Sequence, residues 1–203
     1  RPSGDLVFEI PDTAAPFELL DYTAMWEEHT LYLNAGSLPG CLALGGLRTV
    51  QVESFPAPYE TAVVAIAQPA KPSTVLAPGP EFLAQELART SRFAESFSGR
   101  GATIRDLLSR WREAGGLGLF GAGHHAAMFL NLMELGDLVE FVIDDHPRKT
   151  GLRMPGSRLP IVGSDRLYEG GLRFCLSSLG YGSERKVMEK HAGFVARGGT
   201  FAS

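Results

Sequence analysis

The fold of this chain is decided by the stretch Leu117-Gly118-Leu119-Phe120-Gly121-Ala122-Gly123-His124-His125-Ala126-Ala127-Met128-Phe129-Leu130. It predicts a short buried strand, a glycine turn and the first turns of a helix, in that order. The pattern Gly121-x-Gly123-x-x-Ala126 places glycine where the chain turns sharply, glycine where a ligand can approach the backbone, and a small residue where helix meets strand. We therefore expect the opening of a βαβ unit.

A second strand is predicted at residues 138–143, which are apolar and rich in β-branched side chains. This strand ends in Asp144-Asp145. Asp144 follows Gly123 by about 20 positions, the separation at which dinucleotide-binding folds place an acid that binds ribose.

Two interpretations of this unit remain open. In the first, the amides at the start of the helix hold a phosphate, and Asp144 accepts a hydrogen bond from a hydroxyl group. In the second, the unit binds nothing, because close packing of helix on strand alone demands small residues. His124 and His125 favour the second for a dinucleotide, since two imidazoles follow the glycine at which the backbone would approach a pyrophosphate.

Composition indicates a soluble globular protein. The chain has 203 residues, 44% of them hydrophobic and 21% charged, and a net charge of −4. This acidic balance argues against nucleic acid as a partner, and the apolar runs are too short to span a membrane. Cys41 and Cys175 have no metal-ligand spacing, so we expect no zinc site but two buried thiols in a reducing cytoplasm. The start at Arg1, without an initiator Met or a signal peptide, suggests a cut inside a longer protein.

Residues 1–68 are expected to form only part of a sheet. The predicted elements are a strand at Leu6–Ile10, a helix at Leu38–Leu44 with Ser37 as its cap, and strands at Leu47–Phe55 and Thr61–Ala67. Three strands are few for an independent sheet, so this segment needs partners. Residues 69–80 are rich in proline and are predicted to be a linker between domains.

Residues 81–203 are predicted to form a second domain of the α/β class. Two helices are expected first, at Phe82–Phe97 and around Ile104–Trp111, the latter ended by Gly115-Gly116 and anchored in the core by Trp111. After the βαβ unit come strands at Ile161–Val162 and Leu172–Leu176, a helix at Glu184–Ala196, and an edge strand after Gly198-Gly199. Repeated alternation of strand and helix predicts a Rossmann-like, doubly wound, mostly parallel sheet.

Glu28-His29 is the sharpest candidate for catalysis. A histidine beside a carboxylate, flanked by Trp26 and Tyr32, can take a proton from a carbon next to a carbonyl group. Adjacent residues do not face each other on a helix, so the pair acts jointly only where the backbone turns. The alternative is that His29 forms a hydrogen bond in a domain interface and that Glu28 belongs to a charged segment exposed to solvent. Spacing alone favours this alternative.

The loop at residues 144–161 is the other candidate. It follows the carboxyl end of a strand, where open α/β sheets bind ligands. Its cations can meet a diphosphate, or they can simply make a soluble surface loop whose prolines fix its path. They are Arg148, Lys149, Arg153 and Arg158.

Several of these motifs together resemble the C-terminal domain of the SAM-dependent sugar C-methyltransferases. They are Gly121-Ala122-Gly123, Phe141-Val142-Ile143-Asp144, Pro147-x-Lys149-x-Gly151, Pro155-Gly156 and Pro160-Ile161. Phe8-Glu9-Ile10-Pro11, and Glu28-His29 with Tyr32, are similar to the closing part of the same family's methyltransferase domain. The resemblance implies that residues 1–68 are the C-terminal part of a class I methyltransferase-like domain, followed by a Rossmann-like C-terminal domain at 81–203.

The resemblance also implies an activity, which is methylation of the carbon next to the keto group of a nucleotide-linked sugar. His29 would be the base and Glu28 its partner, or the two residues would share these roles. SAM would be bound mainly by sequence outside this chain, and zinc only by a separate N-terminal domain, so this piece alone should be inactive. The expected partners are the nucleotide sugar and a second copy in a homodimer, with neither nucleic acid nor membrane. The substrate-binding residues would be Trp26, Tyr32, Gly121, Gly123, His124, Asp144 and Lys149.

The sequence departs from the family pattern at two places. Trp26 stands where the family usually has Tyr, and Ala57-Pro58-Tyr59-Glu60 replaces a glycine-rich step. Two other functions stay open. One is a non-catalytic module that binds a nucleotide or NAD through Gly121, Gly123 and Asp144, and the other is a purely structural or dimerising domain.

Overall fold

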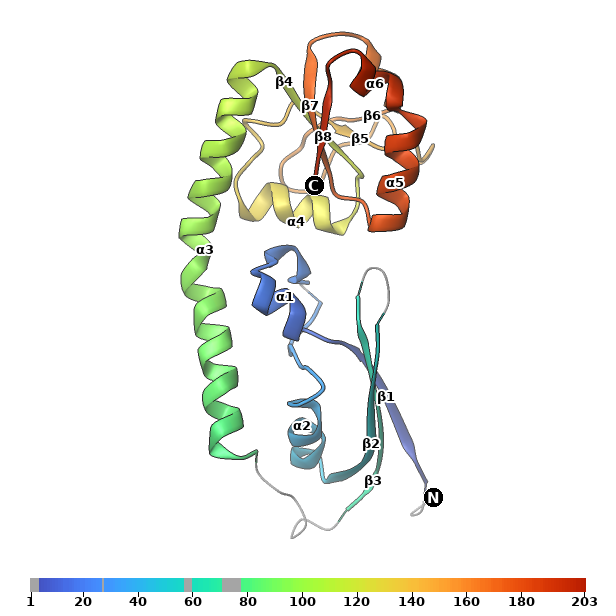
Figure 1. The fold of residues 1–203 in the computed structure, drawn as a ribbon. Coiled ribbons are helices and arrows are strands. Elements are labelled where there is room, and N and C mark those ends of the chain that lie inside the picture. Colours follow the sequence, from blue (N-terminus) through green and yellow to red (C-terminus); the bar gives the residue numbers. More distant parts are fainter. Residues whose placement is uncertain (1–3, 27, 57–59, 71–77) are drawn as a thin grey trace. The chain divides into compact units, whose positions relative to one another are not determined.

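The computed structural model describes residues 4–26, 28–56, 60–70 and 78–203 (Figure 1). These residues divide into two compact units, Arg1–Ser96 and Phe97–Ser203, each of which is described by itself. The division falls within helix α3 (Pro80–Ala114). The part of the predicted linker at 71–77 and the substituted step at 57–59 lie outside the described residues.

The first unit contains a three-stranded antiparallel sheet. Its strands are β1 (Leu6–Pro11), β2 (Leu47–Phe55) and β3 (Ala62–Pro69), in the order β1-β3-β2. Between β1 and β2 the chain forms α1 (Ala14–Leu19), the short helix η1 (Tyr22–Ala24) and α2 (Leu38–Leu44). The predicted strands and the helix at 38–44 are confirmed, although Ser37 bonds to the backbone of Asn34 instead of capping the helix with its side chain.

One face of this sheet is covered by α2. Leu38 and Leu42 of the helix pack with alternate residues of β3, because side chains alternate between the faces of a strand. These β3 residues are Val63, Ala65 and Ala67. In contrast, Val7 on β1 is 67% exposed and Phe55 on β2 is 49% exposed. The unit is therefore a small sheet with one well-packed face.

Helix α3 corrects the prediction of two separate helices. Gly99 and Gly101 weaken a helix through their backbone entropy, but they do not break this one. Gly101 also lies against the second unit's own core, since a Cβ at this position would be 3.5 Å from the sulfur of Met133. Packing therefore outweighs local propensity at these positions.

Aromatic side chains anchor α3 within each unit. In the first unit, the Tyr22 hydroxyl donates to the carbonyl of Phe93 at 2.8 Å, and the ring of Phe17 stacks on that of Phe93 at 4.5 Å. In the second unit, Trp111 stacks on Phe174 with a centroid distance of 5.1 Å. Trp111 therefore has the anchoring contact that the sequence predicts.

The second unit is a five-stranded parallel sheet. Its strands are β4 (Gly116–Phe120), β5 (Val142–Ile143), β6 (Ile161–Val162), β7 (Leu172–Ser177) and β8 (Thr200–Ala202). The strand order is β6-β5-β4-β7-β8, and every pair is parallel. This confirms the predicted α/β class and the doubly wound sheet. The order reverses between β4 and β7, which makes their carboxyl ends the switch point of the sheet.

Two predicted elements of this unit are corrected. Residues 138–141 are not part of β5, because the amides of Leu138 and Val139 donate to the carbonyl of Leu135 and form a turn after α4 (His124–Leu132). The predicted helix at 184–196 is two helices, α5 (Tyr181–Lys190) and α6 (Ala192–Ala196). The break lies at His191, whose φ and ψ of −109° and 29° are not helical.

Both faces of the parallel sheet are covered. Phe174 contacts α3, whereas its neighbour Cys175 points the opposite way, into a cluster with Leu167 of the short helix η3 (Ser164–Tyr168) and Phe194 of α6. Burial raises the pKa of the Cys175 thiol to about 12, so this cysteine is a core residue. Cys41 is only partly buried, which corrects the expectation of two buried thiols.

His191 is a buried titratable group in this core. Its side chain is 4% exposed, its Nδ1 lies 3.1 Å from the Tyr168 hydroxyl, and its Nε2 is buried without a hydrogen-bond partner among the described residues. Burial lowers the pKa of His191, as does the nearby Lys190, and this outweighs the opposing charges of Asp145 and Asp165. The folded unit therefore disfavours the imidazolium form.

This predicts that the second unit loses stability as the pH falls below about 6.5, the ordinary pKa of histidine. Below that value the unfolded chain binds a proton that the folded chain resists, so the free energy of unfolding should decrease by at most about 1.4 kcal/mol per pH unit. Urea titrations between pH 5 and 8 can follow the fluorescence of Trp111 in a Trp26→Phe background. His191→Gln should flatten the slope, and an unchanged slope in that variant would contradict the prediction.

Candidate functional site

The glycine turn between β4 and α4 needs glycine at its first position. Gly121 has a φ of +103°, and a Cβ there would lie 2.8 Å from side-chain atoms of Leu179 and Ser178. The hydroxyl of Ser178 donates to the carbonyl of Gly121 at 2.8 Å, so the turn is also fastened to the end of β7. Sequence reasoning missed Ser178, because nothing in its local pattern marks it as a partner of residue 121.

Gly123 is not required by packing. Its backbone is extended, it is exposed, and among the described residues no atom lies within 4 Å of the position of a Cβ. It stands directly before α4 and has no side chain with which to cap that helix. A ligand therefore has room to approach the backbone at Gly123, as that prediction requires. Ala126, in contrast, is fully buried and serves packing.

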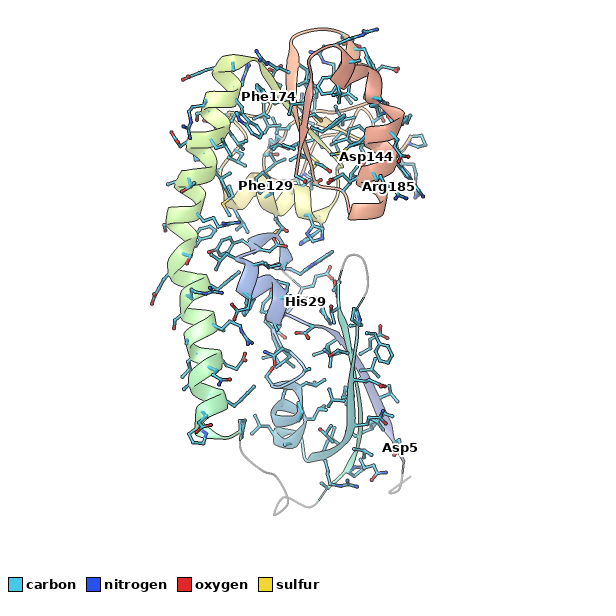
Figure 2. All side chains as sticks on the ribbon, viewed as in Figure 1. Asp5, His29, Phe129, Asp144, Phe174 and Arg185 are labelled. Atoms are coloured by element: carbon cyan, nitrogen blue, oxygen red, sulfur yellow. The ribbon has the colours of Figure 1, made fainter. Side chains whose placement is uncertain are left out.

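Asp144 leaves the end of β5 and turns toward the glycine turn (Figure 2). Its Oδ2 accepts the amide of Ala122 at 3.0 Å and the ammonium of Lys149 at 2.9 Å, and its Oδ1 accepts the amide of His146 at 2.9 Å. Burial by itself raises the pKa of Asp144, but the donors from Lys149, His146 and Ala122 outweigh it and leave this pKa below its ordinary value. The side chain is ionised at neutral pH.

Lys149 completes the same arrangement. Its ammonium donates to Asp144 and also to the carbonyl of Ala122 at 2.9 Å. The structure therefore brings together four residues singled out in the sequence: Gly121, Asp144, Lys149 and, at the first position of α4, His124. The rings of His124 and His125 meet edge to face at 5.9 Å.

The loop that carries Lys149 is fastened to α4 by Asn131. The Asn131 amide donates to the carbonyl of Pro155 at 3.1 Å and lies against Gly156, where a Cβ would be only 2.4 Å from it. Gly156 also has a φ of +72°. The motif Pro155-Gly156 is thus explained by structure, and Asn131 is a partner that sequence reasoning missed. Among the other cations of this loop, Arg148, Arg153 and Arg158 are exposed.

The predicted catalytic residues lie in the first unit, in the loop after η1 (Figure 2). The Tyr32 hydroxyl bonds to both the amide and the carbonyl of Trp26, each at 2.9 Å, and the ring of His29 lies 6.1 Å from Trp26 and 6.0 Å from Tyr32. Trp26, His29 and Tyr32 therefore form one aromatic group.

Glu28 stands apart from this group. It lies in a turn, so the backbone is not helical at this pair, but Glu28 and His29 are both exposed. In the described part of the chain these two side chains form no hydrogen bond or ion pair with each other. The assignment of Glu28 as the partner of His29 stays a prediction.

Among the residues that the structure describes, no group of three His, Cys, Asp or Glu side chains is placed to hold a metal ion. In the same residues, no helix combines the length and the apolar character needed to cross a membrane.

Comparison with known protein families gives a match over most of the chain. Residues 62–203 match the family described as the C-methyltransferase C-terminal domain. This match begins at β3 and includes all of the second unit, with the glycine turn, Asp144 and Lys149. No curated protein matches the sequence.

The geometry of the turn predicts different effects for its two glycines. Gly121→Ala should destabilise the second unit by about 2 kcal/mol or more, because it combines a left-handed backbone with contacts of 2.8 Å. The matched variant Gly123→Ala should change the stability by about 0.5 kcal/mol or less, since the space is open and φ is negative. Urea unfolding of both variants tests this, and equal losses of stability would contradict it.

Proposed function

The chain belongs to the family of C-methyltransferase C-terminal domains, and from this we propose that it is part of a SAM-dependent enzyme that methylates a carbon of a keto-sugar nucleotide. The match over residues 62–203 carries this proposal. The sugar nucleotide as substrate rests on the resemblance of the sequence motifs. In this proposal the chain supplies the sugar-nucleotide side of the cleft, and His29 is the base.

The proposed chemistry needs a base near a carbon that is acidic because it lies next to a ketone. His29 takes the proton from that carbon, and the electron pair of the broken C–H bond is delocalised onto the keto oxygen as an enolate. When bound, SAM would supply the electrophilic methyl group: the carbon would form its new bond as the S–CH3 bond breaks, and S-adenosylhomocysteine would leave with that electron pair. Trp26 and Tyr32 support the assignment of His29, because their rings hold the loop around it.

The second unit is suited to the anionic part of a sugar nucleotide. The carboxyl ends of β4 and β7 form the switch point of the sheet, and there Gly123 leaves the backbone at the start of α4 uncovered. Lys149 adds positive charge at this turn. A diphosphate is the chemical group that fits this set of donors.

Asp144 is not placed to hold the ribose of SAM. A ribose is held best by a carboxylate with both oxygens available, whereas Asp144 already accepts three hydrogen bonds from the protein. The three hydrogen bonds that Asp144 accepts also argue against the alternative function of an NAD-binding module. In this proposal the methyl donor is bound by sequence outside these 203 residues.

Titration calorimetry tests where SAM binds. The 203-residue chain should show no binding of SAM in the micromolar range, whereas the full-length protein should bind it. The heat of binding is the measured quantity, and dilution of SAM into buffer is the control. Micromolar binding of SAM to the chain alone would place the donor site here and overturn this division of roles.

Replacement of His29 tests the catalytic proposal. In the full-length protein, His29→Ala should lower kcat for methylation of a keto-sugar nucleotide by about 100-fold or more, because general-base catalysis contributes this much. Arg110→Ala, on an exposed part of α3 where Arg110 pairs only with Asp106 in the described structure, should leave kcat unchanged. Full activity in His29→Ala would remove His29 from the reaction.

A further inference from the structure

Asp144 and Lys149 hold the backbone of a single residue from both sides. The amide of Ala122 donates to Asp144 Oδ2, and the carbonyl of Ala122 accepts from Lys149 Nζ, while Asp144 and Lys149 pair with each other at 2.9 Å. These three hydrogen bonds fix the two peptide groups that flank the Cα of Ala122. Ala122 lies between the two glycines of the turn, which have the least conformational restriction of any residues.

The loop after β5 is built to bring Lys149 back to this turn. The amide of His146 donates to Asp144 Oδ1 at 2.9 Å, the amide of Lys149 donates to the carbonyl of His146 at 2.8 Å, and Thr150 Oγ1 donates to the carbonyl of Asp144 at 3.0 Å. Gly151 then has a φ of +86° and returns the chain to β6 through a bond to the carbonyl of Ile161. The motif Pro147-x-Lys149-x-Gly151 thus places one ammonium group.

Exposure separates the two members of the pair. The side chain of Asp144 is 15% exposed, whereas that of Lys149 is 41% exposed. Oδ2 of Asp144 already accepts two donors, and Oδ1 accepts one. Asp144 therefore lacks the two open oxygens with which a carboxylate grips a ribose diol, although its position in the sequence is that of a ribose-binding acid.

We propose that Asp144 and Lys149 are positioning residues, which together fix the turn at Ala122 so that the start of α4 is preformed for the anionic part of the substrate. In this assignment neither residue reads a ribose. The part of the inference that concerns the substrate rests on the proposed function, whereas the fixing of the turn does not. Positioning of this kind improves binding because the turn is ordered before the ligand arrives.

The test compares Lys149→Met with Arg148→Met in the 203-residue chain. Both variants remove one positive charge from the same loop, but only Lys149 bonds to Ala122 in the described structure. The first measurement is the hydrogen exchange rate of the Ala122 amide. It should rise by about tenfold or more in Lys149→Met and stay within about twofold of wild type in Arg148→Met, because Lys149→Met removes the two ammonium bonds that hold Asp144 and Ala122 in place, and loss of even one charge-assisted bond corresponds to about that factor.

The second measurement is the affinity for UDP and dTDP by calorimetry. The dissociation constant of whichever nucleotide binds should rise by about tenfold in Lys149→Met and by less than about threefold in Arg148→Met. Lys149→Arg, which retains a cationic donor able to bridge two oxygens, should restore both the exchange rate and the affinity to within about threefold of wild type. Trp111 fluorescence verifies that each variant is folded.

The outcomes separate the inference from the proposed function. Unchanged exchange of the Ala122 amide in Lys149→Met would overturn the positioning role, as would equal losses of affinity in the two Met variants. Faster exchange together with unchanged affinity would also overturn it. If wild type binds neither nucleotide while Lys149→Met still loses protection at Ala122, the turn is held as proposed, and the sugar-nucleotide function is contradicted instead.

Discussion

The second unit depends on how the backbone of Ala122 is fixed between Asp144 and Lys149. A turn between two glycines has many conformations available, and this ion pair selects one of them. The pair forms only if β5 lies beside β4 in parallel and ends at the right register, with Phe120 opposite Ile143. The pairing of the strands, the path of the loop and the conformation of the turn therefore depend on one another. Asn131 also holds the loop against α4 through its hydrogen bond to Pro155.

The fold could be predicted from the sequence where local patterns and tertiary packing agree. The glycine turn and the parallel strands were readable because short apolar runs alternate with helical patterns. The predictions failed where packing overrides local preference. Two separate helices were predicted, at Phe82–Phe97 and around Ile104–Trp111, but α3 is continuous through Gly99 and Gly101. Leu138 and Val139 look like strand residues, but they are apolar because they lie in a turn close to the core.

The candidate site was predictable in position but not in partners. Spacing from Gly123 pointed to Asp144, and the loop composition pointed to Lys149, but the bonds that both make to Ala122 were not predicted. Sequence spacing predicts where a carboxylate lies at the end of a strand. It does not predict which hydrogen-bond donors of the folded protein the carboxylate will bind. Ser178 and Asn131 escaped notice for the same reason, since their partners lie far along the chain. The bond of the Tyr32 hydroxyl to the backbone of Trp26 is likewise a product of folding.

Asp144 and Glu28 are the two acidic residues with proposed roles. They differ in how many hydrogen bonds each already accepts from the protein. Asp144 already accepts three hydrogen bonds from the protein. A carboxylate used in this way mainly orders the backbone around it. Glu28 is exposed in a loop and accepts no hydrogen bond from the described residues, so its capacity to bond remains available to another molecule. Rigid elements with saturated polar groups and loops with unsaturated ones are the usual division between scaffold and chemistry in α/β proteins. By this criterion the wound sheet of this chain is the scaffold, and the loop around His29 stays the proposed place of the reaction.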